Sequence, residues 1–298
     1  MPGPRRSPAW TIGPLAAEGR RRLAGLKAAA AALESRVLLR RALGVTELEI
    51  LAYPERLVAA AAAGRYLRLI DRRTAREPFA YLIGEREFWS IPISVGPAVL
   101  IPRPETETLV ETALELAGEG PLLVADVGTG SGAVALALAT ELRDARVLAT
   151  DISPAALRTA RGNAARHGLR NIEFLAGDLC APLRRRAWTG QVDLLVSNPP
   201  YVREADWARL QPEVRDYEPK SALVPGPTGL EILRRLIAEA TVCLRPGGWL
   251  AVEIGRGQAR AVRRMFGAGW DEVRVKPDLR GIVRVIAARF GGRPAVKP

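Results

Sequence analysis

Apolar and polar residues follow two different periods along this chain of 298 residues. Between residues 15 and 82, apolar side chains such as Leu23, Leu26 and Leu33 recur at helical spacing, which predicts a small helical domain. From residue 104 onward, short apolar runs alternate with helical segments, which predicts a parallel sheet with helices on both faces. The predicted division is an N-terminal helical domain at residues 1–86, a hairpin linker at residues 87–103 and an α/β domain at residues 104–298.

A glycine-rich turn follows the first apolar run of the α/β region. Residues 121–127 are predicted to form a buried strand, and a helical segment rich in alanine and leucine begins at Ala133. Between them lie Gly128, Thr129, Gly130, Ser131 and Gly132. Strand, glycine turn and helix together start a nucleotide-type α/β unit, in which the helix N-terminus faces the ligand. The spacing is G-x-G-x-G, not the dinucleotide G-x-G-x-x-G, and no P-loop lysine follows.

A second predicted strand, at residues 145–150, ends in Asp151. That carboxylate lies roughly 20 residues past the glycine turn, where an acidic residue binds ribose hydroxyls. Ribose binding without a pyrophosphate motif favours S-adenosylmethionine over NAD. The alternative is that the glycines serve only helix–strand packing. The ordered set of strand, turn, second strand and acid favours ligand binding.

The tetrapeptide Asn198-Pro199-Pro200-Tyr201 follows a predicted buried strand, Val192–Ser197. Neither proline has a backbone N–H and both have φ near about −65°, so the turn is stiff and its carbonyls are free to accept. The Asn198 oxygen adds an acceptor and the Tyr201 ring adds a flat wall. Such a turn suits an –NH2 group on an amide or an aromatic amine, so these four residues are the predicted catalytic residues. Alone, the tetrapeptide would be interpreted as a turn that closes a strand.

The core motifs resemble those of a class I S-adenosylmethionine-dependent methyltransferase of the amino-methylating branch. Nearly the whole chain resembles the release factor glutamine methyltransferase family. The matching stretches are residues 76–85, 99–107, 218–219, 222–223 and 253–255. Residues 103–107, Arg-Pro-Glu-Thr-Glu, are the most discriminating. A departure lies at residues 225–230, where Pro-Gly-Pro-Thr-Gly-Leu replaces the family's usual Gly-Gly-x-Asp-Gly-Leu.

The resemblance implies a Rossmann-like, seven-stranded sheet whose last strand, predicted at residues 281–289, runs antiparallel. It implies S-adenosylmethionine as the cofactor, with Asp178 accepting from the adenine amino group and Leu179 packing against the ring. An ordinary turn at a strand end is the alternative for Asp178. The implied substrate is the glutamine of the Gly-Gly-Gln motif of peptide chain release factors, and we expect the helical domain to recognise this protein.

A glutamine amide nitrogen attacks poorly because it shares its lone pair with the carbonyl. Asn198 Oδ1 and the Pro199 carbonyl are predicted to hold its two hydrogens, which favours the partial positive charge that grows on nitrogen during transfer. Placing the nitrogen in line with the methyl–sulfur bond is predicted to supply most of the remaining acceleration. No strong general base is required.

Composition limits the partners, the metal sites and the cellular location that the protein is expected to have. The net charge is +12, but only four of the 44 basic residues are lysines and the arginines are spread along the chain, so direct nucleic-acid binding is not expected. No apolar stretch approaches the ~18–20 residues of a membrane span, and no signal peptide is predicted. The two cysteines, Cys180 and Cys243, and the single histidine show no metal-type spacing, so no metal site is expected. We expect a cytoplasmic monomer.

Two other functions stay open from the sequence. One keeps the glutamine chemistry but uses a ribosomal protein as substrate. The other is N6-adenine methylation of nucleic acid, because adenine-directed enzymes share the Asn-Pro-Pro-Tyr motif. That function requires a target-recognition domain or an aromatic platform for a flipped base, and the N-terminal helical domain has few aromatic residues.

Overall fold

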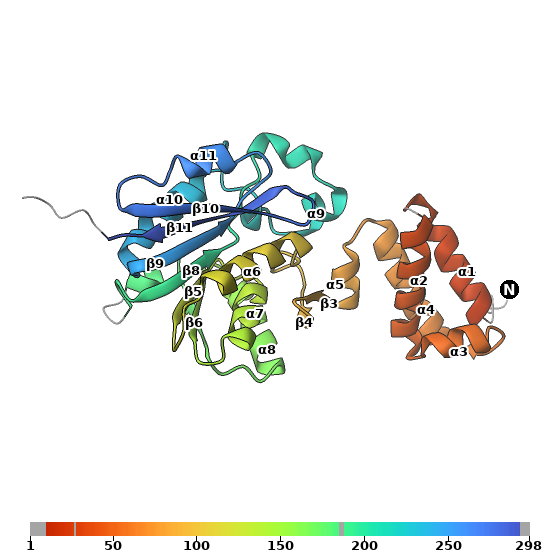
Figure 1. The fold of residues 1–298 in the computed structure, drawn as a ribbon. Helices are drawn as coiled ribbons and strands as arrows, with labels where there is room; N and C mark the ends of the chain where they lie inside the picture. Colours follow the sequence, from red (N-terminus) through yellow and green to blue (C-terminus); the bar gives the residue numbers. More distant parts are fainter. Residues whose placement is uncertain (1–9, 27, 185–187, 293–298) are drawn as a thin grey trace, which may run out of the picture. The chain divides into compact units, whose positions relative to one another are not determined.

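The chain folds into two compact units, coloured along the sequence in Figure 1. The structure is a computed structural model that describes residues 10–26, 28–184 and 188–292. The helical unit consists of Met1–Gly84 and Pro212–Tyr217, and the sheet unit consists of Glu85–Gln211 and Glu218–Pro298. A six-residue helix from the α/β part of the sequence, α9 (Pro212–Tyr217), therefore belongs with the helical unit.

Helices predicted from the apolar spacing are confirmed in the helical unit. Its other elements are β1 (Trp10–Thr11), α1 (Ile12–Arg22), η1 (Leu23–Gly25), α2 (Ala28–Leu43), α3 (Glu47–Ala52), β2 (Leu57–Val58), α4 (Ala60–Thr74) and α5 (Phe79–Ile83). Their core-facing residues, among them Leu15, Leu38 and Ile70, are fully buried. Helix α3 begins with a capping box, in which Thr46 and Glu49 satisfy each other's backbone N–H groups.

Tyr66 on α4 is the largest fully buried side chain of the described residues. Its hydroxyl hydrogen-bonds to Ser35 Oγ at 2.7 Å, so the polar end of the ring is satisfied inside the core. A Cβ atom at Gly19 would lie 1.7 Å from this hydroxyl. Glycine at position 19 therefore allows α1 to pack directly over the ring.

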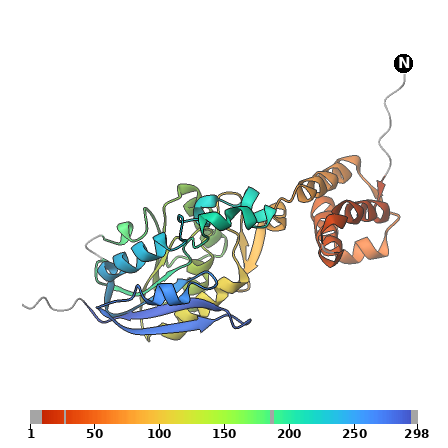
Figure 2. The same ribbon diagram turned by 90° about the horizontal axis from the view of Figure 1, so that it is seen from above.

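Seven strands form the sheet of the other unit, in the order β10-β11-β9-β8-β5-β6-β7. Strands β5, β6, β7, β8 and β9 pair in parallel, whereas β11 is antiparallel to both β9 and β10, as the resemblance implied. Figure 2 shows the long β10–β11 pair. The strands are β5 (Leu123–Val127), β6 (Arg146–Asp151), β7 (Ile172–Ala176), β8 (Val192–Ser197), β9 (Leu244–Glu253), β10 (Trp270–Pro277) and β11 (Val283–Phe290).

Helices cover both faces of this sheet, which confirms the predicted α/β architecture. Helices α6, α7 and α8 lie on one face, and α10 and α11 on the other (Figure 1). Their bounds are α6 (Glu107–Leu116), α7 (Ala133–Glu141), α8 (Pro154–Arg166), α10 (Glu231–Cys243) and α11 (Ala259–Arg263), with short 3-10 helices η2 (Pro104–Thr106), η3 (Ala181–Arg184), η4 (Glu204–Arg209) and η5 (Lys220–Ala222). No helix of the described residues is long and apolar enough to span a bilayer.

A hairpin of β3 (Glu85–Phe88) and β4 (Ile91–Ser94) precedes the sheet in the sequence. It is tied to the glycine turn by Asn163, a buried residue of α8. The Asn163 side chain accepts from the Ser94 N–H at 2.9 Å and donates to the carbonyls of Ser94 at 3.1 Å and Ser131 at 2.9 Å. One amide thus fixes the hairpin against the predicted ligand loop.

Candidate active site

Three neighbouring strands bring the predicted site residues to one edge of the sheet. Strand β5 lies between β8 and β6 and is parallel to both, so the carboxyl ends of all three meet at the same edge. The glycine turn follows β5, Asp151 ends β6 and Asn198 follows β8. The two polar residues therefore flank the glycine turn, in the crevice where open α/β sheets bind ligands.

The three glycines of the turn all have a left-handed backbone, with φ of 77° at Gly128, 56° at Gly130 and 86° at Gly132. Other residues would be strained there. A Cβ atom at Gly128 or Gly130 would have no protein atom within 4 Å, whereas one at Gly132 would lie 2.9 Å from Leu136 and 3.0 Å from Ala160. The first two glycines leave open space beside the backbone, and the third permits close packing of α7 on α8.

The Asp151 carboxylate is fixed to this turn. Its Oδ2 accepts from the Gly130 N–H and its Oδ1 from the Ser153 N–H, each at 2.8 Å. Burial raises the pKa of Asp151, and these N–H donors oppose that rise. Because each carboxylate oxygen has two lone pairs, both oxygens can still accept from a ribose hydroxyl.

The Asn198 side chain is oriented by Thr106, the last residue of η2. Asn198 Nδ2 donates to Thr106 Oγ1 at 3.0 Å, so the amide oxygen is directed away from this partner. Within the described residues, neither Asn198 Oδ1 nor the Pro199 carbonyl has a protein hydrogen-bond donor. The turn therefore presents two acceptors without a protein donor among the described residues.

A buried carboxyl group lies behind the turn. Glu253, at the end of β9, is 1% exposed, and its Oε1 accepts from the Tyr201 hydroxyl at 3.2 Å. Its Oε2 has no hydrogen-bond partner among the described residues. Burial raises the pKa of Glu253 to about 7, and the hydroxyls of Thr106 and Tyr201 lower it by less. Burial likewise raises the pKa of Tyr201, and the neighbouring Glu253 raises it further.

A second buried acid holds the segment that precedes Thr106. Glu218 accepts from the Ile101 N–H at 3.0 Å and forms an ion pair with Arg103. Its side chain is 1% exposed. Since Arg103 and its neighbour Pro102 face the same hollow as Asn198, Glu218 fixes one wall of the site.

The glycine turn and Asn198 line a small hollow of about 50 Å³. Its lining is Leu100, Pro102, Arg103, Thr106, Asp126, Gly128, Thr129, Gly130, Ser131, Ala133, Val134 and Asn198. Asp126 is 1% exposed and accepts from Thr129 Oγ1 at 2.6 Å, and burial raises the pKa of Asp126 to about 7. A space of this size holds only a few water molecules, so a larger ligand must extend along the strand edge toward Asp151.

The two predicted adenine contacts lie elsewhere on the edge, after β7. Asp178 forms an ion pair with Arg235 of α10 at 2.6 Å. Leu179 has a left-handed φ of 46° and packs on the apolar core. Neither residue lines the hollow, and an adenine amino group would share the Asp178 carboxylate with Arg235.

Residues 225–230, where the sequence departs from the family's usual motif, form a turn that local hydrogen bonds close. Thr228 donates its N–H and its hydroxyl to Glu231 Oε1, each at 2.7 Å, and the other Glu231 oxygen accepts from the Leu230 N–H at 3.0 Å. These bonds close the turn that leads into α10. Gly229, with φ of 74°, would place a Cβ atom 2.4 Å from the Tyr201 carbonyl, so this turn closely encloses Tyr201.

Four residues of this region had no predicted role: Thr106, Asp126, Glu218 and Glu253. Three of them, Thr106, Glu218 and Glu253, lie in the stretches that resemble the family. This resemblance could have marked them as candidate site residues. For Asp126 the signal is an acidic residue inside an otherwise apolar strand. The predicted site residues outside the lining of the hollow, besides Asp178 and Leu179, are Gly132, Asp151, Pro199, Pro200 and Tyr201.

A larger hollow of about 390 Å³ lies in the helical unit. Arginines and apolar residues line it: Arg41, Ala42, Arg65, Arg68, Leu69 and Arg72. This lining has no acceptor side chain for an amide hydrogen, so the candidate chemistry remains at the strand edge. Among the described residues, no group of three His, Cys, Asp or Glu side chains could hold a metal ion.

Comparisons with known proteins agree with this geometry. The family model of a methyltransferase domain matches residues 124–217, and the model of a PrmC N-terminal domain matches residues 15–84. The chain is 44% identical over 283 residues to the release factor glutamine methyltransferase of Nitratidesulfovibrio vulgaris, with 94% of this chain and 95% of that protein covered. It is 47% identical over 276 residues to that of Moorella thermoacetica, with 91% and 95% covered.

A solved structure shares the fold. The catalytic domain of hMettl16 aligns with a TM-score of 0.53 at 17% identity, covering 81% of this chain and 86% of that one. This likeness concerns the fold alone.

The buried Glu253 carboxyl predicts a pH-dependent stability. Its pKa rises from 4.5 to about 7 on folding, so protonation favours the folded state. This stabilisation is complete below about pH 4.5 and is lost as the pH rises through 7, a change of about 3 kcal/mol. Glu253→Gln keeps the shape and the acceptor for Tyr201 but cannot ionise. In denaturant unfolding, the wild type should lose stability relative to this variant across that range, and parallel curves would contradict the assignment.

Proposed function

Because the chain belongs to the release factor glutamine methyltransferase family, we propose that it methylates N5 of the glutamine in the Gly-Gly-Gln motif of peptide chain release factors. The methyl donor is S-adenosylmethionine. The observation that carries the proposal is the pair of unused acceptors at Asn198 Oδ1 and the adjacent Pro199 carbonyl, of which Asn198 lines the glycine-turn hollow. Two acceptors match the two hydrogens of a primary amide.

The strand edge has the groups that S-adenosylmethionine requires. Gly128 and Gly130 leave their backbone open to a ligand, and Asp151 offers carboxylate oxygens to ribose hydroxyls. A phosphate-binding lysine, which a dinucleotide or nucleoside triphosphate would favour, does not follow the turn. When bound, S-adenosylmethionine supplies an electrophilic methyl group on a positively charged sulfur. We propose that Asp178 and Leu179 border its adenine end.

The residues around Asn198 hold the nucleophile. Thr106 binds the Asn198 NH2 group, which leaves Oδ1 for one hydrogen of the substrate amide, while the Pro199 carbonyl accepts the other. Both acceptors stabilise the positive charge that grows on the amide nitrogen, so they act more strongly in the transition state than in the ground state. The Tyr201 ring limits the space beside the amide, and its hydroxyl is held by Glu253.

The two cysteines indicate the cellular compartment. Cys180 and Cys243 are free and fully buried, which suits a reducing cytoplasm. We propose a monomer whose helical unit recognises the protein substrate. The match of that unit to a PrmC N-terminal domain supports this role.

Mass spectrometry of the substrate tests the proposed function. Wild-type enzyme and S-adenosylmethionine should add one methyl group to the motif glutamine of an intact release factor. A release factor with alanine in place of that glutamine should gain none. Methylation of a ribosomal protein or of adenine in an oligonucleotide, with none on the release factor, would replace the proposal by one of the alternatives.

Removal of the Asp151 carboxylate tests the cofactor site. Asp151→Ala should weaken S-adenosylmethionine binding by about 1.5–3 kcal/mol, the value of a hydrogen bond to a charged group. Part of this loss would come from a looser glycine turn, because Asp151 also binds the Gly130 N–H. Asp151→Asn keeps one oxygen and should lose less. Calorimetry that gave wild-type affinity for the alanine variant would remove Asp151 from the site.

Substitution of Asn198 tests the chemistry. Asn198→Ala should lower turnover by roughly 10²–10³-fold, if one acceptor here is worth as much as one oxyanion-hole donor. Cofactor affinity should change much less. Asn198→Asp keeps an acceptor but adds a negative charge and loses the NH2 group that binds Thr106, so it should also be clearly impaired. Wild-type turnover of a glutamine peptide by the alanine variant would show that the amide is held elsewhere.

A further inference from the structure

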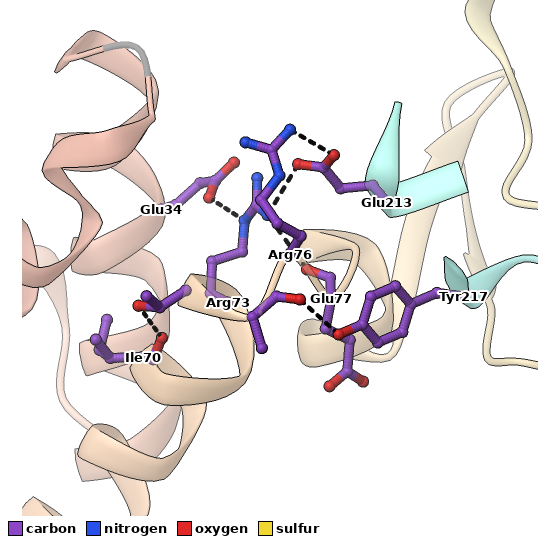
Figure 3. Close-up of polar contacts among 9 residues, drawn as sticks. Glu34, Ile70, Arg73, Arg76, Glu77, Glu213 and Tyr217 are labelled. Atoms are coloured by element: carbon purple, nitrogen blue, oxygen red, sulfur yellow. Dashed lines mark hydrogen bonds and ion pairs between the residues drawn. The ribbon is translucent and has the colours of Figure 1, made fainter. Parts of the chain in front are cut away.

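Helix α9 is bound to the helical unit through one carboxylate and one hydroxyl. Glu213 Oε1 accepts from Arg73 at 3.1 Å and its Oε2 accepts from Arg76 at 2.7 Å (Figure 3). Four residues later, the Tyr217 hydroxyl donates to the Ala75 carbonyl at 2.6 Å. All of these contacts lie within the helical unit, although α9 is separated from α4 by more than 130 residues of sequence.

The Arg73–Glu213 ion pair of α9 is well shielded from water, whereas the Arg76 side chain of the second pair is 39% exposed. The side chains of Arg73 and Glu213 are 7% and 15% exposed. Arg73 also pairs with Glu34 of α2 at 2.6 Å, so its guanidinium joins two carboxylates that come from distant parts of the chain. Burial opposes ionisation, but hydrogen bonds from a backbone N–H and from the two arginines hold the pKa of Glu213 below its usual range. Such shielded pairs are more specific in geometry than surface ion pairs.

Arg76 occupies a backbone position that favours glycine. The end of α4 is a Schellman motif, in which the Arg76 N–H bonds to the Arg73 carbonyl at 2.9 Å and the Glu77 N–H to the Arg72 carbonyl at 3.1 Å. Arg76 has the left-handed φ of 70° that this motif requires. Glycine would adopt this backbone conformation without strain, whereas arginine is strained in it. The Arg76 side chain binds Glu213.

The residue after α9 belongs to the wall of the candidate active site. Tyr217 binds the helical unit, and the next residue, Glu218, binds Ile101 and Arg103 beside the glycine-turn hollow. Consecutive Cα atoms are about 3.8 Å apart, so Tyr217 and Glu218 are held close together along the chain. The Tyr217–Glu218 peptide bond therefore joins the unit that we propose recognises the substrate to the residues that shape the transfer site.

We propose that Glu213 is a positioning residue that couples engagement of an intact protein substrate by the helical unit to the geometry of the methyl-transfer site. The proposal rests on the proposed function. It predicts that Glu213 matters for a folded release factor, which engages both units. It should matter much less for a short glutamine peptide, which needs only the strand edge.

Two variants with opposite effects on local stability test it. Glu213→Gln removes the charge that both arginines bind. Arg76→Gly removes only the Arg76–Glu213 pair but relieves the strained backbone, so its thermal stability should equal or exceed that of the wild type. Both should lower kcat/KM for the intact release factor by about 5- to 150-fold, the usual range of coupling between sites. Neither should change the kcat/KM of the peptide or the affinity for S-adenosylmethionine by more than about twofold.

Asp216→Asn is the matched control. Asp216 is on the same helix and exposed, and it pairs with the adjacent Arg215 and not with Arg73 or Arg76 of α4 and its C-terminal turn. The kcat/KM of the Asp216→Asn variant should match that of the wild type on both the intact release factor and the peptide. Equal losses on protein and peptide, or no loss on either, would overturn the proposal. A wild-type enzyme that failed on the release factor itself would instead contradict the proposed function, so the two failures are distinguishable.

Discussion

The parallel pairing of β5 with β8 on one side and β6 on the other is the constraint on which the site depends. It places the ends of three strands side by side, so the glycine turn, Asp151 and Asn198 meet without any long loop to bring them together. The sheet is rigid because its central strands are buried on both faces. Small turns at its edge can then hold acceptors at fixed positions, which is what electrostatic stabilisation of a weak nucleophile requires.

Orientation of Asn198 needs a polar network inside an apolar unit. Thr106 binds the Asn198 NH2 group, and Glu253 interacts with both Thr106 and Tyr201. Burying an acid with one unpaired oxygen is unfavourable, and its raised pKa expresses that. The arrangement is consistent with a site in which an amide must present its oxygen and not its nitrogen to the substrate.

Local patterns predicted the fold and the turns well. The bounds of β8 match the predicted strand residue for residue, and the glycines of the turn have the left-handed backbone that only glycine adopts freely. Pairings across the chain were not predictable. Asp178 meets Arg235 across 57 residues of sequence, and Glu213 meets Arg73 across 140. Charged partners leave no periodic signal, so no sequence pattern indicated that α9 belongs with the helical unit.

Arg76 and Glu253 break local rules of stability for different reasons. A left-handed backbone at a non-glycine residue costs roughly 1–2 kcal/mol, and glycine at position 76 would avoid it. An apolar residue at position 253 would avoid the unpaired oxygen. Such exceptions point to places where geometry matters more than stability. Here one exception lies behind the acceptor turn, and the other holds the helix whose next residue binds the wall of the site.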